Sequence, residues 1–588
     1  MITPYLQRPF DHVPRKSIKE EPYGSSDGEP GGSGDDESDG SDDEGSEESS
    51  LTDPARNTSR GKYTLVIVLD GLRSDLITAE SMPNLHSFGE RGIVCENHHA
   101  VFPSKTRVNA ATVATGCYPA SHGIVHNELF LPAVSAEPLN TGDDATLREI
   151  ERATGGRALT AVGLGQLLEE RDRTLFAAGS GSPGSTMLLN HKSSGAGVFN
   201  ARGFVSPPAN RSLAERRLDG FSEKRAPNTA QNRWAVDAYL DVALTRRNPP
   251  DVSVLWISDP DVTMHSCGVG HPRVFVALRE IDDELGRIFE TLRTKQLAEE
   301  TNVFVLSDHG FSTNRGTLDV PRILSKHGLE EGVHVVGGTQ IFLPGGDERR
   351  VERIVRLLQR TDGVGAIFTR PADPSDGKTA NGFAAGTQSQ SAPETGSRPV
   401  PETANQPTAK ASNGKREKTD TESASGVEGV ISGTFSMELV RVDHDRAPEV
   451  LFAPDWDDRE NEHGYPGTTS RRGIGGHGTL SPYEMCVHLR AGGPDLEGGG
   501  ARSLVPTGHV DLAPTILHLL GIRPPATMDG RILHELFVDG PDPDSLTVTR
   551  DEVRTASSAD CSYRSTLHRS HVAGRDYPMA AYTRRDGA

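Results

Sequence analysis

The sequence contains few cysteines and no long apolar run. Its five cysteines lie far apart without a CxxC spacing, and their odd number argues against a disulfide framework. No apolar stretch is long enough to cross a bilayer, and the first residues, MITPYLQRPFDHVPRK, lack the apolar core of a signal peptide. The sequence therefore predicts reduced thiols, no membrane segment and a cytoplasmic location.

The chain also lacks an excess of positive charge. Its formal net charge is -21, and 13 acidic residues with no Lys or Arg fall within residues 20–48. The remainder therefore carries only about -8, so the acidity belongs mostly to the N-terminal segment. Because surfaces that bind nucleic acids through net charge are basic, we expect no such surface here.

The apolar fraction of 34% is low for a chain that folds throughout. Residues 1–60 are rich in Gly, Ser, Asp and Glu, and residues 370–429 are rich in Gly, Ser, Thr, Pro, Gln and Lys. Such compositions bury too little apolar surface to offset chain entropy. We predict a disordered acidic tail over residues 1–60, one large domain over residues 61–540 with a disordered insertion at 370–429, and an extension over residues 541–588.

Three short apolar runs predict buried parallel strands at residues 63–69, 252–257 and 302–306. Acid follows each run, with Asp70 after the first, Asp259 and Asp261 after the second, and Asp308 after the third. Helical patterns lie between the runs, and ligands of open α/β sheets bind beyond the carboxyl ends of the strands. The sequence therefore predicts an α/β fold with a mostly parallel central sheet flanked by helices.

A second feature is the stretch VFPSKTRVNAATVATGCYPASHGIVHN, which spans residues 101–127. Pro103 and Ser104 end an extended run, and Thr106 opens a segment with a helical pattern. A hydroxyl at a helix N-terminus lies where backbone N–H groups favour an anion such as phosphate. The alternative is that Thr106 is only a helix N-cap.

Acid, His and Thr residues at or just after the predicted strand ends form a candidate metal site. Asp261 and His265 are four residues apart, so one helical turn would place both on one face. Asp308 and His309 are adjacent and can share an ion only where the backbone turns sharply, which Gly310 permits. Carboxylate and imidazole ligands together suit Zn²⁺ or a similar ion. The candidates are Asp70, Thr106, Asp261, His265, Asp308, His309 and His477.

Taken with their order along the chain, these motifs resemble a known family. From Leu65 to about Leu533, apart from the insertion, the chain is similar to the nucleotide pyrophosphatase/phosphodiesterase (type I phosphodiesterase) branch of the alkaline phosphatase superfamily. The resemblance is carried by VIVLDGLRSD at 66–75, FPSKT at 102–106, ATGCYPASHGIVHN at 114–127, DPDVTMH at 259–265, LSDHGF at 306–311, GGHG at 475–478 and VDLAPTILHLLGI at 510–522.

The resemblance implies an alkaline-phosphatase-like catalytic domain that acts on a small phosphate ester or nucleotide. It implies that Thr106 is a nucleophile that becomes transiently phosphorylated and that Asn127 steadies a phosphoryl oxygen. It also implies two divalent metal ions, with Zn²⁺ expected. One ion would be held by Asp70, Thr106, Asp308 and His309, and the other by Asp261, His265 and His477.

Elementary chemistry agrees with these roles. A Thr hydroxyl is a poor nucleophile at neutral pH, and coordination to a cation lowers its pKa. Two ions clamp the attacking and leaving oxygens of an in-line displacement, and an amide such as Asn127 stabilises charge on the phosphoryl group.

Two departures from the family pattern concern the substrate. Nucleotide-cleaving members typically have an aromatic residue and Pro after the nucleophile, where this chain has Arg107 and Val108. Arg107 either binds a phosphate or carboxylate through its forked donors or is a surface residue of the helix. The usual Asp-Ser-Ser-Gly-His run is also changed, to DVTMH at 261–265, although the Asp-to-His spacing is kept.

Alternatives to a phosphodiesterase therefore remain open. A phosphomonoesterase or a phosphonoacetate-hydrolase-like enzyme would use the same two-metal Thr site. A catalytically silent binding module is a third possibility, but such a relative would be expected to have lost a metal position, and no expected residue type is missing here. The sequence does not indicate the oligomeric state.

Overall fold

A large sheet of ten strands forms the centre of the protein in the computed structural model, which describes residues 61–192, 195–371, 427–557 and 562–586. Its middle strands are parallel and run in the order β9 (Thr301–Leu306), β1 (Tyr63–Leu69), β8 (Val252–Ile257), β5 (Leu175–Gly179) and β6 (Gly197–Asn200). On the β9 side, β19 (Cys486–Gly492) is antiparallel to both β9 and β2 (Ile93–His99). The predicted α/β class with a mostly parallel sheet is confirmed.

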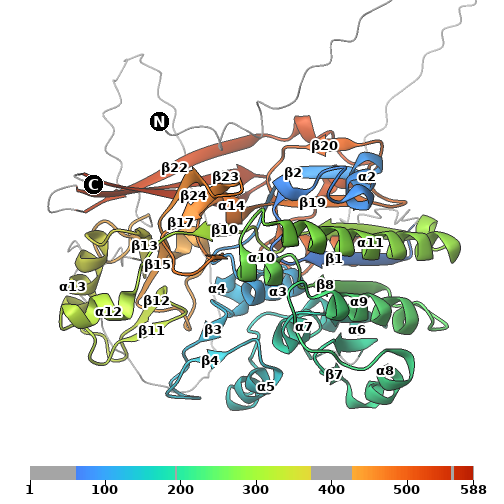
Figure 1. The fold of residues 1–588 in the computed structure, drawn as a ribbon, viewed down its shortest axis with the longest axis horizontal. Coiled ribbons are helices and arrows are strands. Elements are labelled where there is room, and N and C mark those ends of the chain that lie inside the picture. The colour runs from blue at the N-terminus through green and yellow to red at the C-terminus, as the bar shows by residue number, and fades with distance from the viewer. Residues whose placement is uncertain (1–60, 193–194, 372–426, 558–561, 587–588) are drawn as a thin grey trace, which may run out of the picture. The chain divides into compact units, whose positions relative to one another are not determined.

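Both faces of this sheet are buried, which explains why its strands are apolar at every position. In β1, Val66 and Val68 belong to one apolar cluster, whereas Leu65, Ile67 and Leu69 belong to another. The first cluster includes residues of α3 (Thr106–Thr115), α6 (Leu164–Glu169), α7 (Pro183–Leu189) and α15 (Leu512–Leu519). The second includes residues of α2 (Pro83–Arg91), α9 (Thr229–Asp237) and α11 (Pro272–Thr294). Figure 1 shows α11 and α9 running along the strands.

The connections between strands place short segments at the carboxyl ends of β1, β8 and β9. Leu69 is paired with Ile257, and Val68 is paired with Leu306, so the three strands end side by side. β8 leads into α10 (Asp261–Cys267), and β9 leads directly into Ser307. The residues that follow these strands therefore meet at one edge of the sheet.

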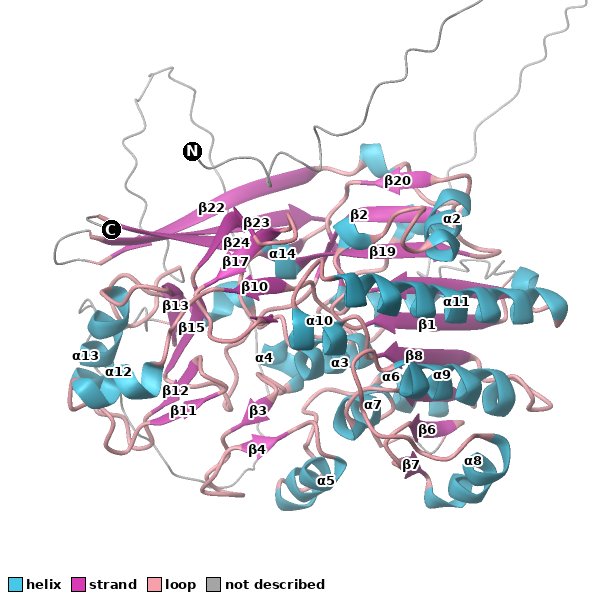
Figure 2. Cartoon of the chain, in the orientation of Figure 1, coloured by secondary structure: helices cyan, strands magenta, loops and turns pink. Residues whose placement is uncertain are grey.

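A smaller five-stranded sheet lies beside the large one. Its order is β11 (His334–Val336), β12 (Gln340–Phe342), β15 (Val450–Pro454), β13 (Val364–Thr369) and β14 (Phe435–Ser436). Apolar residues of these strands form one cluster with residues of α12 (Val320–Lys326) and α13 (Glu348–Gln359). Figure 2 shows both helices beside this sheet. A four-stranded sheet with the order β16 (Trp456–Glu460), β17 (Pro466–Thr469), β10 (Ser312–Asn314) and β18 (Gly475–Gly476) connects the two regions.

The C-terminal residues form a three-stranded antiparallel sheet. Within the predicted extension, β23 (Tyr563–Val572) and β24 (Arg575–Arg585) pair as an antiparallel hairpin. A third strand, β22 (Val548–Ala556), has no apolar run and pairs with β23. Hydrogen bonds join this sheet to the rest of the protein, for example from Tyr577 Oη to Asp511 Oδ2 at 2.9 Å.

Several sequence predictions fall partly or wholly outside the described residues. The acidic tail of residues 1–60 does so entirely, and so does most of the insertion at 370–429. Where that insertion leaves and rejoins the described chain, Pro371 and Gly429 form an antiparallel bridge. Among the described residues, Cys95, Cys117, Cys267 and Cys486 form no disulfide, and Cys561 lies outside these residues. Within the described ranges, no helix has the length and apolarity that a bilayer span requires.

Candidate two-metal site

The predicted metal ligands come together at the carboxyl edge of the large sheet. Asp70 follows β1, and its backbone oxygen accepts a hydrogen bond of 2.9 Å from the N–H of Asp261, which opens α10. The backbone N–H of Gly71 donates to Asp308 Oδ1 at 3.0 Å, which fixes Asp308 beside Asp70. Gly71 has a φ of 75°, and a Cβ at this position would lie 2.9 Å from Asp261 Cβ. Glycine is therefore needed here both for its backbone conformation and because a side chain would collide with Asp261.

Asp70, Asp308 and His309 form the first group, called here the buried triad. His309 Nε2 lies 3.5 Å from Asp70 Oδ1 and 3.2 Å from Asp308 Oδ2. Partners outside the triad hold it in place, because Trp256 Nε1 donates to Asp70 Oδ2 at 2.9 Å. The sequence analysis assigned Gly310 to a sharp backbone turn, but its φ is not positive. Glycine is needed here because a Cβ would lie 2.0 Å from the backbone oxygen of Tyr483.

Asp261, His265 and His477 form the second group, the open triad. Asp261 Oδ1 lies 3.2 Å from His265 Nε2, one turn along α10, and 3.6 Å from His477 Nε2. The His265 side chain is 44% exposed, whereas that of His477 is 6% exposed. The rings of His477 and His309 stack with their centroids 3.5 Å apart, so the two triads are adjacent.

The geometry of both triads fits cations. One oxygen of each acid, Asp70 Oδ1, Asp261 Oδ1 and Asp308 Oδ2, is buried without a hydrogen-bond partner. Burial lowers the pKa of His309 to about 4, so its ring is neutral at physiological pH and the short distances to carboxylates are not ion pairs. A positive ion between them would stabilise electron-pair donors that face each other in this way.

The histidine tautomers support the same conclusion. His309 Nδ1 lies 2.9 Å from the backbone oxygen of Gly310, and His477 Nδ1 lies 2.6 Å from that of Ser104. A neutral ring must donate its proton to each of these oxygens, which leaves the Nε2 lone pair directed into the triad. Burial, followed by repulsion from neighbouring carboxylates, raises the pKa of Asp70 well above its usual range, and burial chiefly does the same for Asp308. A bound cation would relieve both effects.

Asp259 shows that an acid after a strand need not face this site. Asp259 lies two residues after the end of β8. Both of its carboxylate oxygens accept hydrogen bonds, among them one of 2.6 Å from Asn228 N and one of 2.7 Å from Thr263 Oγ1. Asp259 therefore holds the start of α10, and Asp261 is the residue with a free oxygen.

Thr106 is the first residue of α3, and its hydroxyl is directed toward the buried triad. Lys105 is the N-cap residue, and no side-chain hydrogen bond caps the helix. Instead Thr106 Oγ1 lies 3.3 Å from His309 Nε2. The alternative that Thr106 only caps α3 is therefore wrong.

Asn127 and Arg107 flank the Thr106 hydroxyl. Asn127 Oδ1 accepts a hydrogen bond of 3.0 Å from the backbone N–H of Arg107, and its Nδ2 group has no partner among the described residues. The Arg107 guanidinium lies 3.4 Å from both Asn127 O and Asn140 Oδ1. Burial lowers the pKa of Arg107, which still leaves the side chain charged at neutral pH.

A buried network that the sequence does not predict holds the open triad against α3. Glu484 Oε2 accepts hydrogen bonds from Gly478 N and Thr479 N at 2.7 Å and from Ser104 Oγ at 3.1 Å. Lys105 Nζ donates to His477 O at 2.5 Å. These contacts fix the loop that carries His477, and no motif in the sequence marks Glu484 as part of this network.

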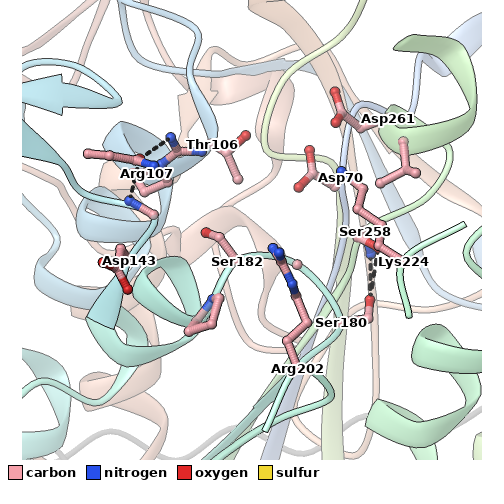
Figure 3. Close-up of a pocket in the computed structure, with 15 residues that line it drawn as sticks. Asp70, Thr106, Arg107, Asp143, Ser180, Ser182, Arg202, Lys224, Ser258 and Asp261 are labelled. Carbon is pink, nitrogen blue, oxygen red and sulfur yellow. Dashed lines mark hydrogen bonds between the residues drawn. The ribbon is translucent and has the colours of Figure 1, made fainter. Parts of the chain in front are cut away.

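A cavity of about 570 Å³ opens beside Thr106 (Figure 3). Three cationic side chains line it, Arg107, Arg202 and Lys224, together with acids of both triads. Its lining residues are Asp70, Thr106, Arg107, Asn140, Gly142, Asp143, Ser180, Gly181, Ser182, Pro183, Arg202, Lys224, Ser258, Asp261 and Val262. Arg202 and Lys224 belong to loops for which the sequence gives no functional signal.

Comparison with known proteins agrees with this geometry. Residues 64–372 match the family model described as type I phosphodiesterase / nucleotide pyrophosphatase. The chain belongs to this family. The match covers β1, α3, β8 and β9 and therefore every candidate site residue except His477.

Relatives within the type I phosphodiesterase family are distant. Mouse ectonucleotide pyrophosphatase/phosphodiesterase family member 3 is 26% identical over 252 residues, 42% of this chain and 24% of that protein. Human bis(5'-adenosyl)-triphosphatase ENPP4 is 26% identical over 250 residues, 42% of this chain and 47% of that protein. The match thus spans less than half the length of either relative.

Solved structures of the family share the fold. Mouse ectonucleotide pyrophosphatase / phosphodiesterase 5 superposes with a TM-score of 0.52 and 15% sequence identity, covering 81% of this chain and 100% of that one. The human counterpart has the same TM-score and 16% identity. At this identity the likeness establishes the fold, and the function depends on the site.

Proposed function

We propose that this protein is a metal-dependent hydrolase of phosphodiester or phosphoanhydride bonds that acts through Thr106. The observation that carries the proposal is the pair of adjacent triads with unpartnered oxygens, next to a hydroxyl that caps no helix. Asp70, Asp308 and His309, with Thr106, would hold one ion, and Asp261, His265 and His477 would hold the other. Imidazole and carboxylate donors suit Zn²⁺.

When bound, two such ions would lower the pKa of the Thr106 hydroxyl and neutralise charge on the phosphoryl group. Thr106 Oγ1 then attacks phosphorus, the bond from phosphorus to the leaving oxygen breaks, and the leaving group takes up a proton. Water next attacks the phosphorylated Thr106, whose phosphorus still carries the second ester or anhydride group of the substrate. The bond from phosphorus to Oγ1 breaks, and Oγ1 takes up a proton to regenerate Thr106. Asn127 is positioned by Arg107 N so that its Nδ2 group can donate to a non-bridging phosphoryl oxygen.

The named relatives support the choice of bond. One is a bis(5'-adenosyl)-triphosphatase, and others are venom phosphodiesterases. A silent binding module is disfavoured, because both triads are complete and share one edge of the sheet.

The first test compares hydrolysis of bis-p-nitrophenyl phosphate with that of p-nitrophenyl phosphate, after chelation and after addition of zinc. We expect zinc to restore activity and the diester to be preferred. A preference for the monoester would replace the proposal with a phosphatase. Acid quenching during turnover of the diester, followed by peptide mass spectrometry, should find a phosphoryl group that still bears one p-nitrophenyl ester on the peptide that contains Thr106. Turnover without this adduct in rapid-quench samples would contradict the covalent mechanism.

A further inference from the structure

The lining of the cavity beside Thr106 includes three positively charged side chains. Arg107 is the second residue of α3, Arg202 lies in the loop after β6, and Lys224 lies in the loop before α9. None of the three forms an ion pair with an acid among the described residues. Figure 3 shows the three side chains around the space that Thr106 and Asp70 also face.

The acids that line the same cavity do not offset these charges. Asp70 and Asp261 are the proposed metal ligands, so their charges would be taken up by the ions. Asp143 is the remaining acid of the lining, and its Oδ2 accepts a hydrogen bond of 3.2 Å from Thr146 Oγ1. With the ligands set aside, the wall therefore carries three cations and one anion.

The wall also lacks a surface on which a nucleobase could stack. No aromatic residue occurs among the described residues that line the cavity, and Arg107 occupies the position after the nucleophile. Its polar groups are instead hydroxyls of Ser180, Ser182 and Ser258 and the amide of Asn140. Such a wall favours a group that carries charge and accepts hydrogen bonds.

We propose that the preferred substrate carries a second anionic group, a carboxylate or a phosphate, beyond the phosphoryl group that reacts, and that Arg107, Arg202 and Lys224 bind this group. The inference rests on the proposed function and names the substrate class for the same site. The guanidinium of Arg107 contributes planar donors to the lining that also includes Thr106, while Arg202 and Lys224 are exposed and can adjust to the position of the anion.

The test uses two p-nitrophenyl phosphodiesters of similar size, one with a propyl group and one with a carboxyethyl group. We expect kcat/KM for the carboxyethyl ester to exceed that for the propyl ester by about tenfold at low salt, because each exposed charge pair contributes a few-fold. This preference should shrink as ionic strength rises. A third ester with a phosphonooxyethyl group distinguishes phosphate from carboxylate as the better second anion.

The double variant R202Q/K224Q should reduce the preference for the anionic esters to about twofold or less. Exposed Arg349 on α13 provides the matched control, and R349Q should keep the wild-type preference. Equal kcat/KM for the propyl and carboxyethyl esters in the wild-type protein would overturn the inference. A preference that survives R202Q/K224Q would overturn the assignment to these side chains.

A binding measurement that needs no turnover distinguishes failure of this inference from failure of the proposed function. By calorimetry, zinc-loaded wild-type protein should bind phosphonopropanoate about tenfold more tightly than propylphosphonate, and R202Q/K224Q should remove most of the difference. If no ester is hydrolysed but this binding difference is found, the proposed function fails and the anion site stands. If esters are hydrolysed without any such difference, the function stands and the anion site fails.

Discussion

The two triads differ mainly in their access to water. In the buried triad the side chains of Asp308 and His309 are 0% exposed, whereas in the open triad the side chain of His265 is 44% exposed. Burial removes water that could take the place of a missing ion, so an empty buried triad leaves charged oxygens unsatisfied. In the open triad, solvent can reach the ligands. We therefore expect the buried triad to bind its ion more firmly and the open triad to exchange its ion.

Substitution of Thr106 should cause the largest loss of activity, because its hydroxyl is the proposed nucleophile and lies next to His309 of the buried triad. Thr106→Ala should lower kcat for a zinc-restored diester by more than about 10³-fold. Thr106→Ser keeps a hydroxyl and should retain part of the activity. Thermal unfolding of both variants should match that of the wild type, since the Thr106 side chain makes no capping hydrogen bond. Substantial activity of Thr106→Ala with an unchanged melting temperature would exclude Thr106 as nucleophile.

Asp308→Asn tests the electrostatic cost of the buried triad. Asp308 Oδ1 accepts from Gly71 N, and an amide at Oδ2 could donate to the neutral His309 ring. Without metal, this variant should be more stable than the wild type by about 1–3 kcal/mol at neutral pH, because it removes an unsatisfied buried charge. With zinc, it should lose activity by more than about 100-fold, a larger loss than changes around metal ligands usually cause.

The stability difference between Asp308→Asn and the wild type without metal should change with pH in a defined direction. Burial raises the pKa of Asp308 in the folded protein, so the folded state holds this proton more tightly than the unfolded state does. The wild type without metal therefore loses stability as pH rises above the ordinary carboxyl range. The advantage of Asp308→Asn should disappear at low pH and grow toward neutral pH. Asp143→Asn, which changes an exposed acid of the cavity, is the control and should show no such trend.

The sequence points to the acids of the buried triad for a physical reason. Strands β1, β8 and β9 are covered on both faces, so their apolar runs are unbroken and the polar residue after each run is easy to recognise. The prediction of Asp261 and His265 as neighbours needed only one helical turn, and α10 provides it. The spacing could not show which of Asp259 and Asp261 has a free oxygen, since that depends on Asn228 and Thr263.

The cavity wall was not predictable in the same way. Arg202 and Lys224 reach the cavity because β5 and β6 lie next to β8 in the sheet, although both residues are far from Thr106 in sequence. Charged residues in loops carry no periodic pattern that a sequence reading could recognise. Which loops lie next to one another depends on how the strands pair. The strand β22 was missed for a related reason, because its residues alternate too little in polarity to indicate a buried face.

His265→Ala tests the open triad and should have a smaller effect than Asp308→Asn. Removal of one exposed ligand should lower activity about 10- to 100-fold at limiting zinc, and excess zinc should restore much of it. Limited chelation of the wild type should likewise remove one of the two ions first. The readouts are activity against zinc concentration and metal content per chain. His327→Ala, at an exposed position after α12, is the control. Simultaneous loss of both ions at one chelator concentration would contradict the proposed difference between the triads.

The smallest effect concerns His509, which joins the nucleophile helix to the strand of the buried triad. Its Nδ1 lies 2.7 Å from Asn109 Oδ1 on α3, and its Nε2 lies 2.9 Å from the backbone oxygen of Ser307, directly before Asp308. Because His509 is not among the residues that line the cavity beside Thr106, we expect it to position Thr106 against the triad without binding substrate. His509→Gln should therefore lower kcat about tenfold, since small displacements of a nucleophile are costly, while KM stays nearly constant. His518→Gln, on α15 beside His534, is the matched control and should change neither constant. A rise in KM with unchanged kcat would contradict a positioning role, and unchanged kcat and KM would show that α3 holds Thr106 without His509.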